Sequence, residues 1–282
     1  MTPTKFSEID NATDLVSYLN ASERLDNSDH IYHYTTLPTV ISMFKSKTWH
    51  LGNAEKMNDH LEYENGDKQR WKNIFFSSFM AEDKESIGMW SMYSQPWENG
   101  VKIAIPRAAA RKWIRNIKEI FEIDLATKQL TGNTMFVEQE HLILSAVAYS
   151  DADSHTVTKN NKDVLRWSNV SNNNIVNAVR IPELTGFIKD MAWSYEKEMR
   201  IRAEFKNIHD YRRIAISLPE EVMETMTITA SPLFKGNLVD KLQREISRQL
   251  YVEKSLFTGR LNIRTICEGC DYKTQKTVLA QA

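Results

Sequence analysis

The stretch Tyr195–Phe205 is the clearest β-strand pattern in the chain, because charged and apolar residues alternate along it. Its charged face would carry Glu196, Glu198, Arg200 and Arg202, since alternate residues of a strand point to one side of a sheet. Two carboxylates and two guanidinium groups on one face form either a solvated ladder of ion pairs or the floor of a polar cleft. A tryptophan and a tyrosine precede the charges, which indicates that the strand starts in buried surroundings.

Short strands and helices are interspersed irregularly along the rest of the chain. Strands are expected at residues 31–34, 49–51, 74–79, 100–105, 213–218, 225–229 and 261–266. Helices are expected at residues 11–26, 35–46, 58–71, 86–93, 107–120, 175–190 and 235–250. This mixture predicts an α+β fold built on one mixed sheet with surrounding helices.

We expect a single domain over residues 1–282, with 1–29 as a helical lead-in and the polar, Asn-rich stretch 151–174 as a loop or insertion. The chain has nine glycines, and none of them forms GxGxxG or GxxxxGK[ST]. A Rossmann domain or a P-loop kinase is therefore not expected, because both need glycines where the backbone approaches phosphates. Any nucleotide must be held in another way.

Composition excludes few classes of function. The formal net charge is −1, which does not indicate a polyanion-binding protein. The polar N-terminus lacks the apolar core of a signal peptide, and the longest apolar stretch, Leu142–Tyr149, is far shorter than the ~20 residues of a membrane span. Cys267 and Cys270 form a lone CxxC without the further ligands of a zinc site, so we expect reduced, structural cysteines. These features predict a cytoplasmic protein without a membrane partner or a bound metal.

Four short motifs carry the residues suited to chemistry. They are IYHYTT at residues 31–36, NDHLEYE at 58–64, SSF…MWSMY at 77–93 and WSYEKEMRIR at 193–202. In order and spacing they resemble a bacterial family formerly without a known function, which is similar to ADP-ribosyltransferase-like phage-defence and toxin proteins.

This resemblance implies a split β-sheet core and NAD as a substrate. The transferases place a His or Arg on a first strand, a Ser or aromatic residue on a second and a Glu on a third. His33, Ser77 or Ser78, and Glu198 match these three positions. Glu196 and Glu198 are similar to an ExE pair in which the second Glu is catalytic. The chain departs from the pattern because a His belongs to one subclass, whereas a Ser-Ser strand with ExE belongs to another that begins with Arg.

The chemistry of NAD cleavage suits these residues. Breaking the bond between nicotinamide and ribose creates a cationic sugar, which the carboxylate of Glu198 would stabilise. His33 would donate to a ribose hydroxyl, and Glu196 would orient or deprotonate the acceptor. Phe79, Trp90 or Tyr93 would stack on nicotinamide. The residues expected to bind NAD are His33, Tyr34, Thr35, Asn58, Ser77, Ser78, Phe79, Trp90 and Tyr93.

Structural roles compete with these functional ones. A lone His on a strand is more often a hydrogen-bonded core or edge residue. Asp59 and Glu62 are explained by capping of the helix expected at 58–71, and Trp90 and Tyr93 have the spacing of core residues on a helix.

A basic helix suggests a partner. Arg107, Arg111, Arg115 and Lys118 would follow one face of the helix expected at 107–120. Such a face is most often solvated, and its functional alternative is contact with the phosphate backbone of RNA or DNA.

The leading hypothesis is a NAD-dependent mono-ADP-ribosyltransferase, an enzyme of glycosyl transfer, acting as a toxin or antiphage effector. Its acceptor would be a nucleic acid, and analogy suggests an antitoxin protein as partner. Two alternatives remain open. One is a metal-dependent nuclease that uses His33, Asp59, Glu62 and Glu196, and the other is a non-catalytic binding or immunity module on the same fold.

Overall fold

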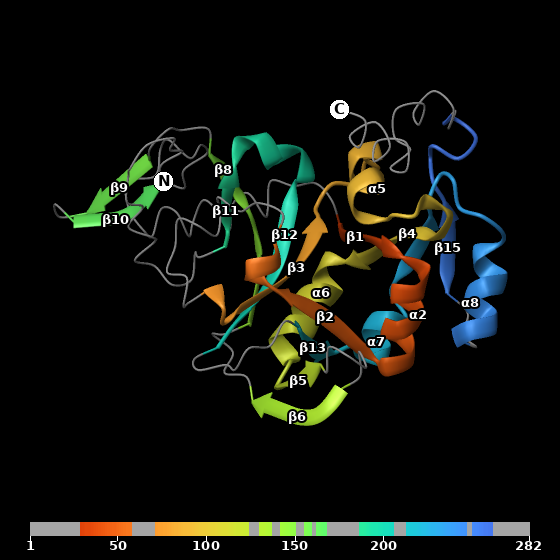
Figure 1. Cartoon of the computed structure of the whole chain (residues 1–282), viewed down its shortest axis with the longest axis horizontal. Helices are drawn as coiled ribbons and strands as arrows, with labels where there is room; N and C mark the ends of the chain where they lie inside the picture. Colours follow the sequence, from red (N-terminus) through yellow and green to blue (C-terminus); the bar gives the residue numbers. More distant parts are fainter. Residues whose placement is uncertain are drawn as a thin grey trace, which may run out of the picture. The chain divides into compact units, whose positions relative to one another are not determined.

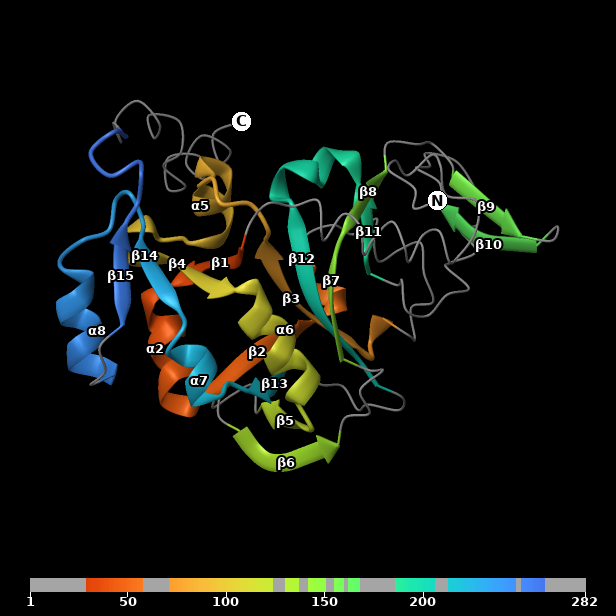
Figure 2. The ribbon, with the colours of Figure 1, turned by 180° about the vertical axis from the view of Figure 1, so that it is seen from behind.

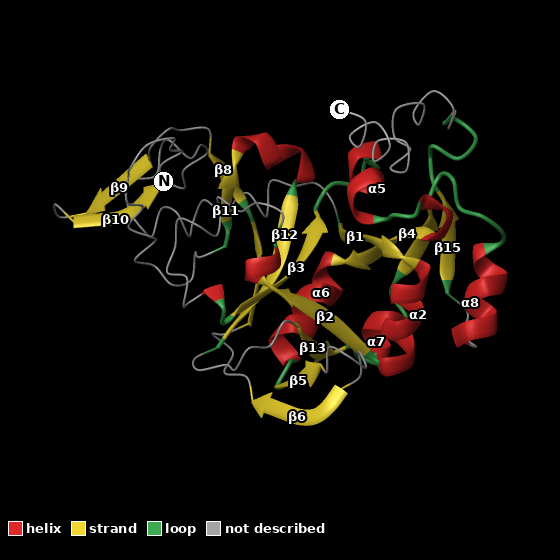
Figure 3. Cartoon of the chain, viewed as in Figure 1, coloured by secondary structure: helices red, strands yellow, loops and turns green. Residues whose placement is uncertain are grey.

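The computed structural model describes residues 29–57, 71–123, 130–136, 142–150, 155–159, 162–167, 186–205, 213–246 and 250–261. These residues form an α+β protein with a large mixed, mostly antiparallel sheet of eleven strands, two separate two-stranded sheets and, in the described ranges, five α-helices (Figures 1 and 3). The contacts divide the chain into two units. Unit 1 comprises residues 1–33, 42–84 and 104–226, and unit 2 comprises residues 34–41, 85–103 and 227–282.

Strand β3 (Ile74–Met80) is the centre of unit 1. One edge pairs along its whole length with the antiparallel strand β12 (Glu198–Glu204), from Glu198 opposite Met80 to Glu204 opposite Ile74. The other edge is shared by two strands. β1 (His30–Thr36) pairs near Met80, and β2 (Thr48–Asn53) pairs near Phe75 and Phe76. The sheet therefore forks along this edge of β3.

The sheet of unit 1 extends outward from β2 and from β12. Beyond β2 follow, each paired with the one before, β13 (Arg213–Ser217), β5 (Glu119–Ile123) and β6 (Leu130–Phe136). The free edge of β12 carries β7 (Leu142–Ala146), which lies beside it in Figure 2. The fully buried Met199, Ile201 and Ala203 give β12 one apolar face, as the alternation in the sequence predicts.

Helices and shorter elements complete unit 1. They are η2 (Ala54–Lys56), α6 (Arg107–Asn116), β8 (Ala148–Ser150), β9 (His155–Lys159), β10 (Lys162–Trp167), β11 (Ile188–Asp190), η6 (Met191–Glu196) and α7 (Glu220–Met223). β8 and β11 form a parallel pair, and β9 and β10 an antiparallel one. Here η marks a 3₁₀-helix.

Unit 2 contains short elements around a small group of strands. They are α5 (Ile87–Tyr93), η3 (Trp97–Asn99), β14 (Thr227–Ala230), α8 (Leu238–Ile246) and β15 (Tyr251–Lys254). β14 and β15 are parallel. The hydroxyl of Ser86 accepts a hydrogen bond from the backbone NH of Met89 at 3.3 Å and caps α5, as serine commonly does at the residue before a helix. The strands β1 and β4 (Gly100–Pro106) and the helix α2 (Leu37–Ser46) include residues of both units.

Most predicted elements within the described residues are confirmed, whereas two expected helices and one expected strand differ from the structure. The helix expected at 107–120 ends at Asn116 and is followed by β5. The strand expected at 195–205 begins at Glu198, because residues 191–196 form a 3₁₀-helix. The stretch 151–174, expected as a loop or insertion, contains the hairpin β9–β10 in its described part. Of the helix expected at 175–190, the structure describes residues 186–190. These residues contain the strand β11 instead of a helix.

The remaining predictions cannot be compared over their whole length. The elements expected at 11–26 and 58–70, most of the strand at 261–266, and Cys267 and Cys270 lie outside the described residues. None of the described helices is long and apolar enough to cross a membrane.

Candidate functional site

Glu198 begins strand β12 and is buried in a network of charges. The strand was expected from Tyr195, but residues 191–196 form η6, and Lys197 turns the chain into β12 with a left-handed φ of 45°. Arg200, two residues on and on the same face, binds Glu198 with two hydrogen bonds: its Nε lies 2.6 Å from Oε1 and its Nη2 lies 3.0 Å from Oε2. This paired geometry is among the strongest that a carboxylate can make.

Lys189 of β11 joins the two glutamates of the ExE pair. Its ammonium nitrogen lies 2.6 Å from Oε2 of Glu196 and 3.2 Å from Oε2 of Glu198. It also lies 4.7 Å from the centre of the Trp193 ring, within the range of a cation–π contact. Lys189, Glu196, Glu198 and Arg200 are each at least 95% buried, so the charged face of β12 is not an exposed ladder.

The environment of Glu198 holds its carboxylate ionised. Burial raises the pKa of Glu198, but the positive charges of Arg200 and Lys189 and hydrogen bonds from Arg200 and Ser78 outweigh it and lower the pKa to about 2. The backbone of Glu198 is fixed as well: its NH donates to the hydroxyl of Tyr149 at 2.8 Å, and its carbonyl accepts from the NH of Val147 at 2.9 Å.

Residues that precede η6 cover this charged face. The carbonyl of Gly186 accepts a hydrogen bond from Nη1 of Arg200. The guanidinium of Arg200 lies 4.9 Å from the centre of the Phe76 ring, and that of Arg202 lies 5.2 Å from the ring of Phe187. The face of the sheet that carries Glu198 is therefore lined by cations, carboxylates and aromatic rings.

His33 lies on the opposite face of the sheet. Its Nδ1 donates to the backbone carbonyl of Ser78 at 2.9 Å, and its ring packs against Trp49 and Phe79 at centroid distances of 5.0 and 5.5 Å. A carbonyl can only accept, so Nδ1 carries the proton in the neutral ring. Burial lowers the pKa of His33, and the hydrogen bond to Ser78 opposes this only in part.

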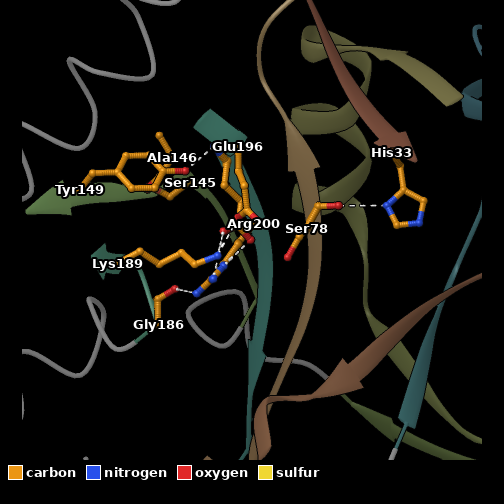
Figure 4. Close-up of polar contacts among 10 residues, drawn as sticks. His33, Ser78, Ser145, Ala146, Tyr149, Gly186, Lys189, Glu196 and Arg200 are labelled. Carbon is orange, nitrogen blue, oxygen red and sulfur yellow. Dashed lines mark hydrogen bonds and ion pairs between the residues drawn. The ribbon is translucent and has the colours of Figure 1, made fainter. Parts of the chain in front are cut away.

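The pairing of the strands explains this placement. Tyr32 and Glu198 both lie opposite Met80, so these three residues share one face, and His33 falls on the other. Figure 4 shows the result: Lys189, Arg200 and Gly186 lie on one side of β3 and His33 on the other, with Ser78 between them. The structure therefore does not bring His33 and Glu198 into one pocket, because the sheet itself separates them.

The serines expected to bind NAD divide between the two faces. Ser78 hydrogen-bonds to Glu198 through its side chain. Ser77 and Phe79 instead lie on the face of His33, where the hydroxyl of Ser77 accepts from Nε1 of Trp49 at 2.8 Å and the Phe79 ring stacks on Trp49 at 5.3 Å. That face continues into the core, since Trp49 also contacts Trp113 of α6 at 5.7 Å.

Four residues expected in the NAD site belong to unit 2. Tyr34 and Trp90 form an edge-to-face ring contact at 4.9 Å, and Nε1 of Trp90 lies 3.4 Å from a carboxylate oxygen of Glu85. Trp90 is fully buried, as the competing core explanation predicts, whereas Tyr93 is half-buried; Thr35 is buried as well. Asn58 lies outside the described residues.

The basic helix α6 is less exposed than expected. Arg107 is 8% exposed, and Lys118 follows the end of the helix at Asn116. Arg115 is exposed and Arg111 is half-buried. The prediction of four cations along one solvated helix face is therefore wrong at both of its ends.

Of the four residues of the alternative metal site, the structure describes His33 and Glu196. Among the described residues, no group of three or more His, Cys, Asp and Glu side chains could hold a metal ion. Asp59 and Glu62 lie outside these residues.

Sequence reasoning did not find Lys189, Tyr149 and Gly186. They reach Glu198 and Arg200 from segments that precede β12 in the chain, and no motif marks them. The only sequence signal was the Trp and Tyr before the ExE pair, which indicated that the strand starts in buried surroundings.

Comparison with known proteins gives one match. Residues 89–201 match the family described as "Protein of unknown function (DUF2971)", a range that begins within α5, includes α6 and ends within β12, and that leaves β1, β2 and β3 outside. No curated protein and no solved structure matches the chain. The chain is thus similar over its middle part to a family that has no described function.

Proposed function

We propose that the protein is a NAD-dependent mono-ADP-ribosyltransferase in which Glu198 is the catalytic carboxylate. The observation that carries this proposal is the order of the strands. The strand that begins with Glu198, the strand with the two serines and the strand with His33 are neighbours in the order β12–β3–β1. The sheet forks at β3, and the ExE pair stands where η6 passes into β12.

The proposed reaction uses the charge of Glu198. The bond between ribose C1′ and the nicotinamide nitrogen breaks, and neutral nicotinamide leaves with the bonding electrons. Glu198 stabilises the positive charge that develops on the sugar, and a hydroxyl or amine of the acceptor then bonds to C1′. Glu196 takes the proton that the acceptor loses. With water as acceptor, the product is free ADP-ribose.

The opposite placement of His33 changes its proposed role. The ribose would be held on the Glu198 face alone, with Ser78 beside the carboxylate. His33 would act as a positioning residue, because its Nδ1 holds the carbonyl of the same serine whose side chain bonds Glu198.

The acceptor and the biological role are proposed from the resemblance. RNA or DNA would meet the cations that remain at the surface near the end of α6, Arg115 and Lys118, together with the half-buried Arg111. An enzyme of this kind would act as a toxin or antiphage effector and would need an antitoxin partner.

A non-catalytic binding module is the second candidate, and the burial of Glu198 favours it. Both carboxylate oxygens are engaged by Arg200 and Lys189, and the residue is 4% exposed. An ion network that only stabilises the fold would show the same contacts and the same burial of Glu198. Under this candidate no nicotinamide is released with any acceptor.

The experiment that separates them is release of nicotinamide from labelled NAD, measured with water, total RNA, DNA or cell lysate as acceptor. We expect release by the native protein, insensitive to EDTA, and a loss of about 100- to 1000-fold in Glu198→Gln. Glu204→Gln is the matched control, because this glutamate lies on the same strand and is more exposed. Full activity of Glu198→Gln would remove Glu198 from the mechanism, and loss of activity in EDTA would favour the nuclease.

A further inference from the structure

Lys189 occupies a cage made of two carboxylates and an aromatic ring. Its ammonium contacts Glu196 at 2.6 Å, Glu198 at 3.2 Å and the face of Trp193 at 4.7 Å. The residue is 5% exposed. All three partners are groups that attract a cation, so the cage is complementary to positive charge whatever molecule carries it.

The same three groups suit a flat organic cation. An aromatic face and a carboxylate are the usual partners of quaternary and pyridinium nitrogen, which carries charge but no hydrogen to donate. In this structure the cation in the cage is the primary ammonium of Lys189, a residue of the chain itself. Its charge offsets the second carboxylate, since Arg200 already neutralises one of the two glutamates.

We infer that Glu196, Glu198 and Trp193 form a binding site for an organic cation, and that Lys189 fills this site in the present structure as a tethered competitor. The cation must displace Lys189 to bind. That the natural ligand is the pyridinium ring of NAD rests on the proposed function.

The segment that carries Lys189 is attached in a way that permits this exchange. Among the described residues, β11 pairs with β8 over three residue pairs, in a two-stranded sheet separate from the large one. Phe187, two residues before Lys189, is 1% exposed, so the segment stays anchored and the exchange concerns the side chain of Lys189 alone. That side chain is held at Glu196 and Glu198 by polar contacts. Such contacts can be exchanged for those of a ligand, whereas a packed apolar face would have to be exposed to water.

The first test uses 1-methylnicotinamide, a cation that cannot be hydrolysed as NAD is, and measures its binding by calorimetry. A cage filled by its own lysine nine-tenths of the time binds an external cation about tenfold more weakly than an empty one. We therefore expect Lys189→Met to bind the probe about tenfold more tightly than the native protein, and Lys189→Arg to bind it no more tightly. Neutral nicotinamide should show no such gain.

The control variant is Lys47→Met, which removes an exposed lysine paired with Glu220 and should leave probe binding unchanged. Unchanged or weaker binding by a folded Lys189→Met would overturn the inference.

The second test needs no variant, so it holds even where Lys189→Met fails to fold. The native protein is acetylated with and without saturating 1-methylnicotinamide, and the modified lysines are identified by mass spectrometry. Displacement should increase labelling of Lys189 several-fold and leave Lys47, which is 69% exposed, unchanged. Equal labelling of Lys189 in both samples contradicts the inference.

The two proposals can fail separately. If the probe binds as expected but no variant releases nicotinamide from NAD, the cation site stands and the transferase fails. If the native enzyme releases nicotinamide but Lys189→Met and the labelling show no change, the transferase stands and the tethered competitor fails.

Discussion

At the scale of single residues, the low pKa of Glu198 makes a prediction about acid stability. A carboxyl group whose pKa is lowered by folding stabilises the protein above its unfolded pKa of 4.5, and this contribution is lost as the pH falls toward 2. The free energy of unfolding, measured with urea, should therefore exceed that of Glu198→Gln by an amount on the order of 3 kcal/mol at pH 6. The difference should shrink toward zero near pH 2. A difference independent of pH would show that the ion network does not stabilise the fold.

His33 gives a second prediction at this scale. His33→Phe keeps an aromatic ring against Trp49 and Phe79 but leaves the carbonyl of Ser78 without its donor, which should cost about 1–3 kcal/mol of unfolding free energy at pH 8. Because burial lowers the pKa of His33, the native protein loses this advantage as the pH falls below 6.5, so the cost should be smaller at pH 5. Any KM for NAD should stay unchanged. A KM for NAD raised tenfold or more in His33→Phe would indicate that His33 contacts the ligand.

At the scale of elements, the sequence predicted the strands but not which residues of neighbouring strands lie opposite one another. Alternation along IYHYTT and YEKEMR shows which residues of one strand share a face. The strands β1 and β3 are found at the expected positions, and β12 begins at Glu198, three residues later than expected. Which residue of one strand lies opposite which residue of the next is set by the turns and the packing, and a shift of one position reverses the face. His33 and Glu198 were expected together and lie apart for this reason.

Gly186 makes a prediction about the segment that covers β12. Its φ is +79°, and an added Cβ would lie 2.1 Å from Cζ of Phe76, the ring on which Arg200 packs. Gly186→Ala should therefore lower the unfolding free energy by about 2–4 kcal/mol, from backbone strain and overpacking together. Gly52→Ala in β2 is the matched control, because its Cβ would meet no atom within 4 Å. Equal urea midpoints for the two variants would contradict this account.

At the scale of the whole molecule, the surroundings of Glu198 are built by contacts between segments far apart in the sequence. The local pattern of apolar and charged residues does not predict such contacts. Helix caps and buried strands depend on neighbouring residues in the sequence and can therefore be predicted from it. Ser86, which caps the start of α5, is an example. The burial of Glu198, in contrast, involves Tyr149, which bonds its backbone NH, and Gly186, which bonds Arg200. Nothing in the local periodicity connects these residues to β12. The charged face was consequently predicted to be solvated or a cleft floor, and the structure shows it filled by the chain's own side chains.

The chain passes between its two units several times, and this argues that they unfold together. β1 and β4 each contain residues of both units, so neither unit can lose its strands without disrupting the other. Lys102→Met tests this, because it breaks a buried ion pair of unit 2 with Glu85, at 3.3 Å and with side chains 7% and 4% exposed. Leaving that carboxylate without its cation should cost about 3 kcal/mol, which for a chain of 282 residues unfolding as one unit lowers the Tm by about 5 °C.

The shift should appear in a single calorimetric transition whose van't Hoff and calorimetric enthalpies agree. Lys235→Met, which removes a pair with Glu98 at the surface of the same unit, should leave the Tm nearly unchanged. Two transitions, of which only one moves in Lys102→Met, would mean that the units unfold independently. The acid stability of Glu198 would then report on unit 1 alone.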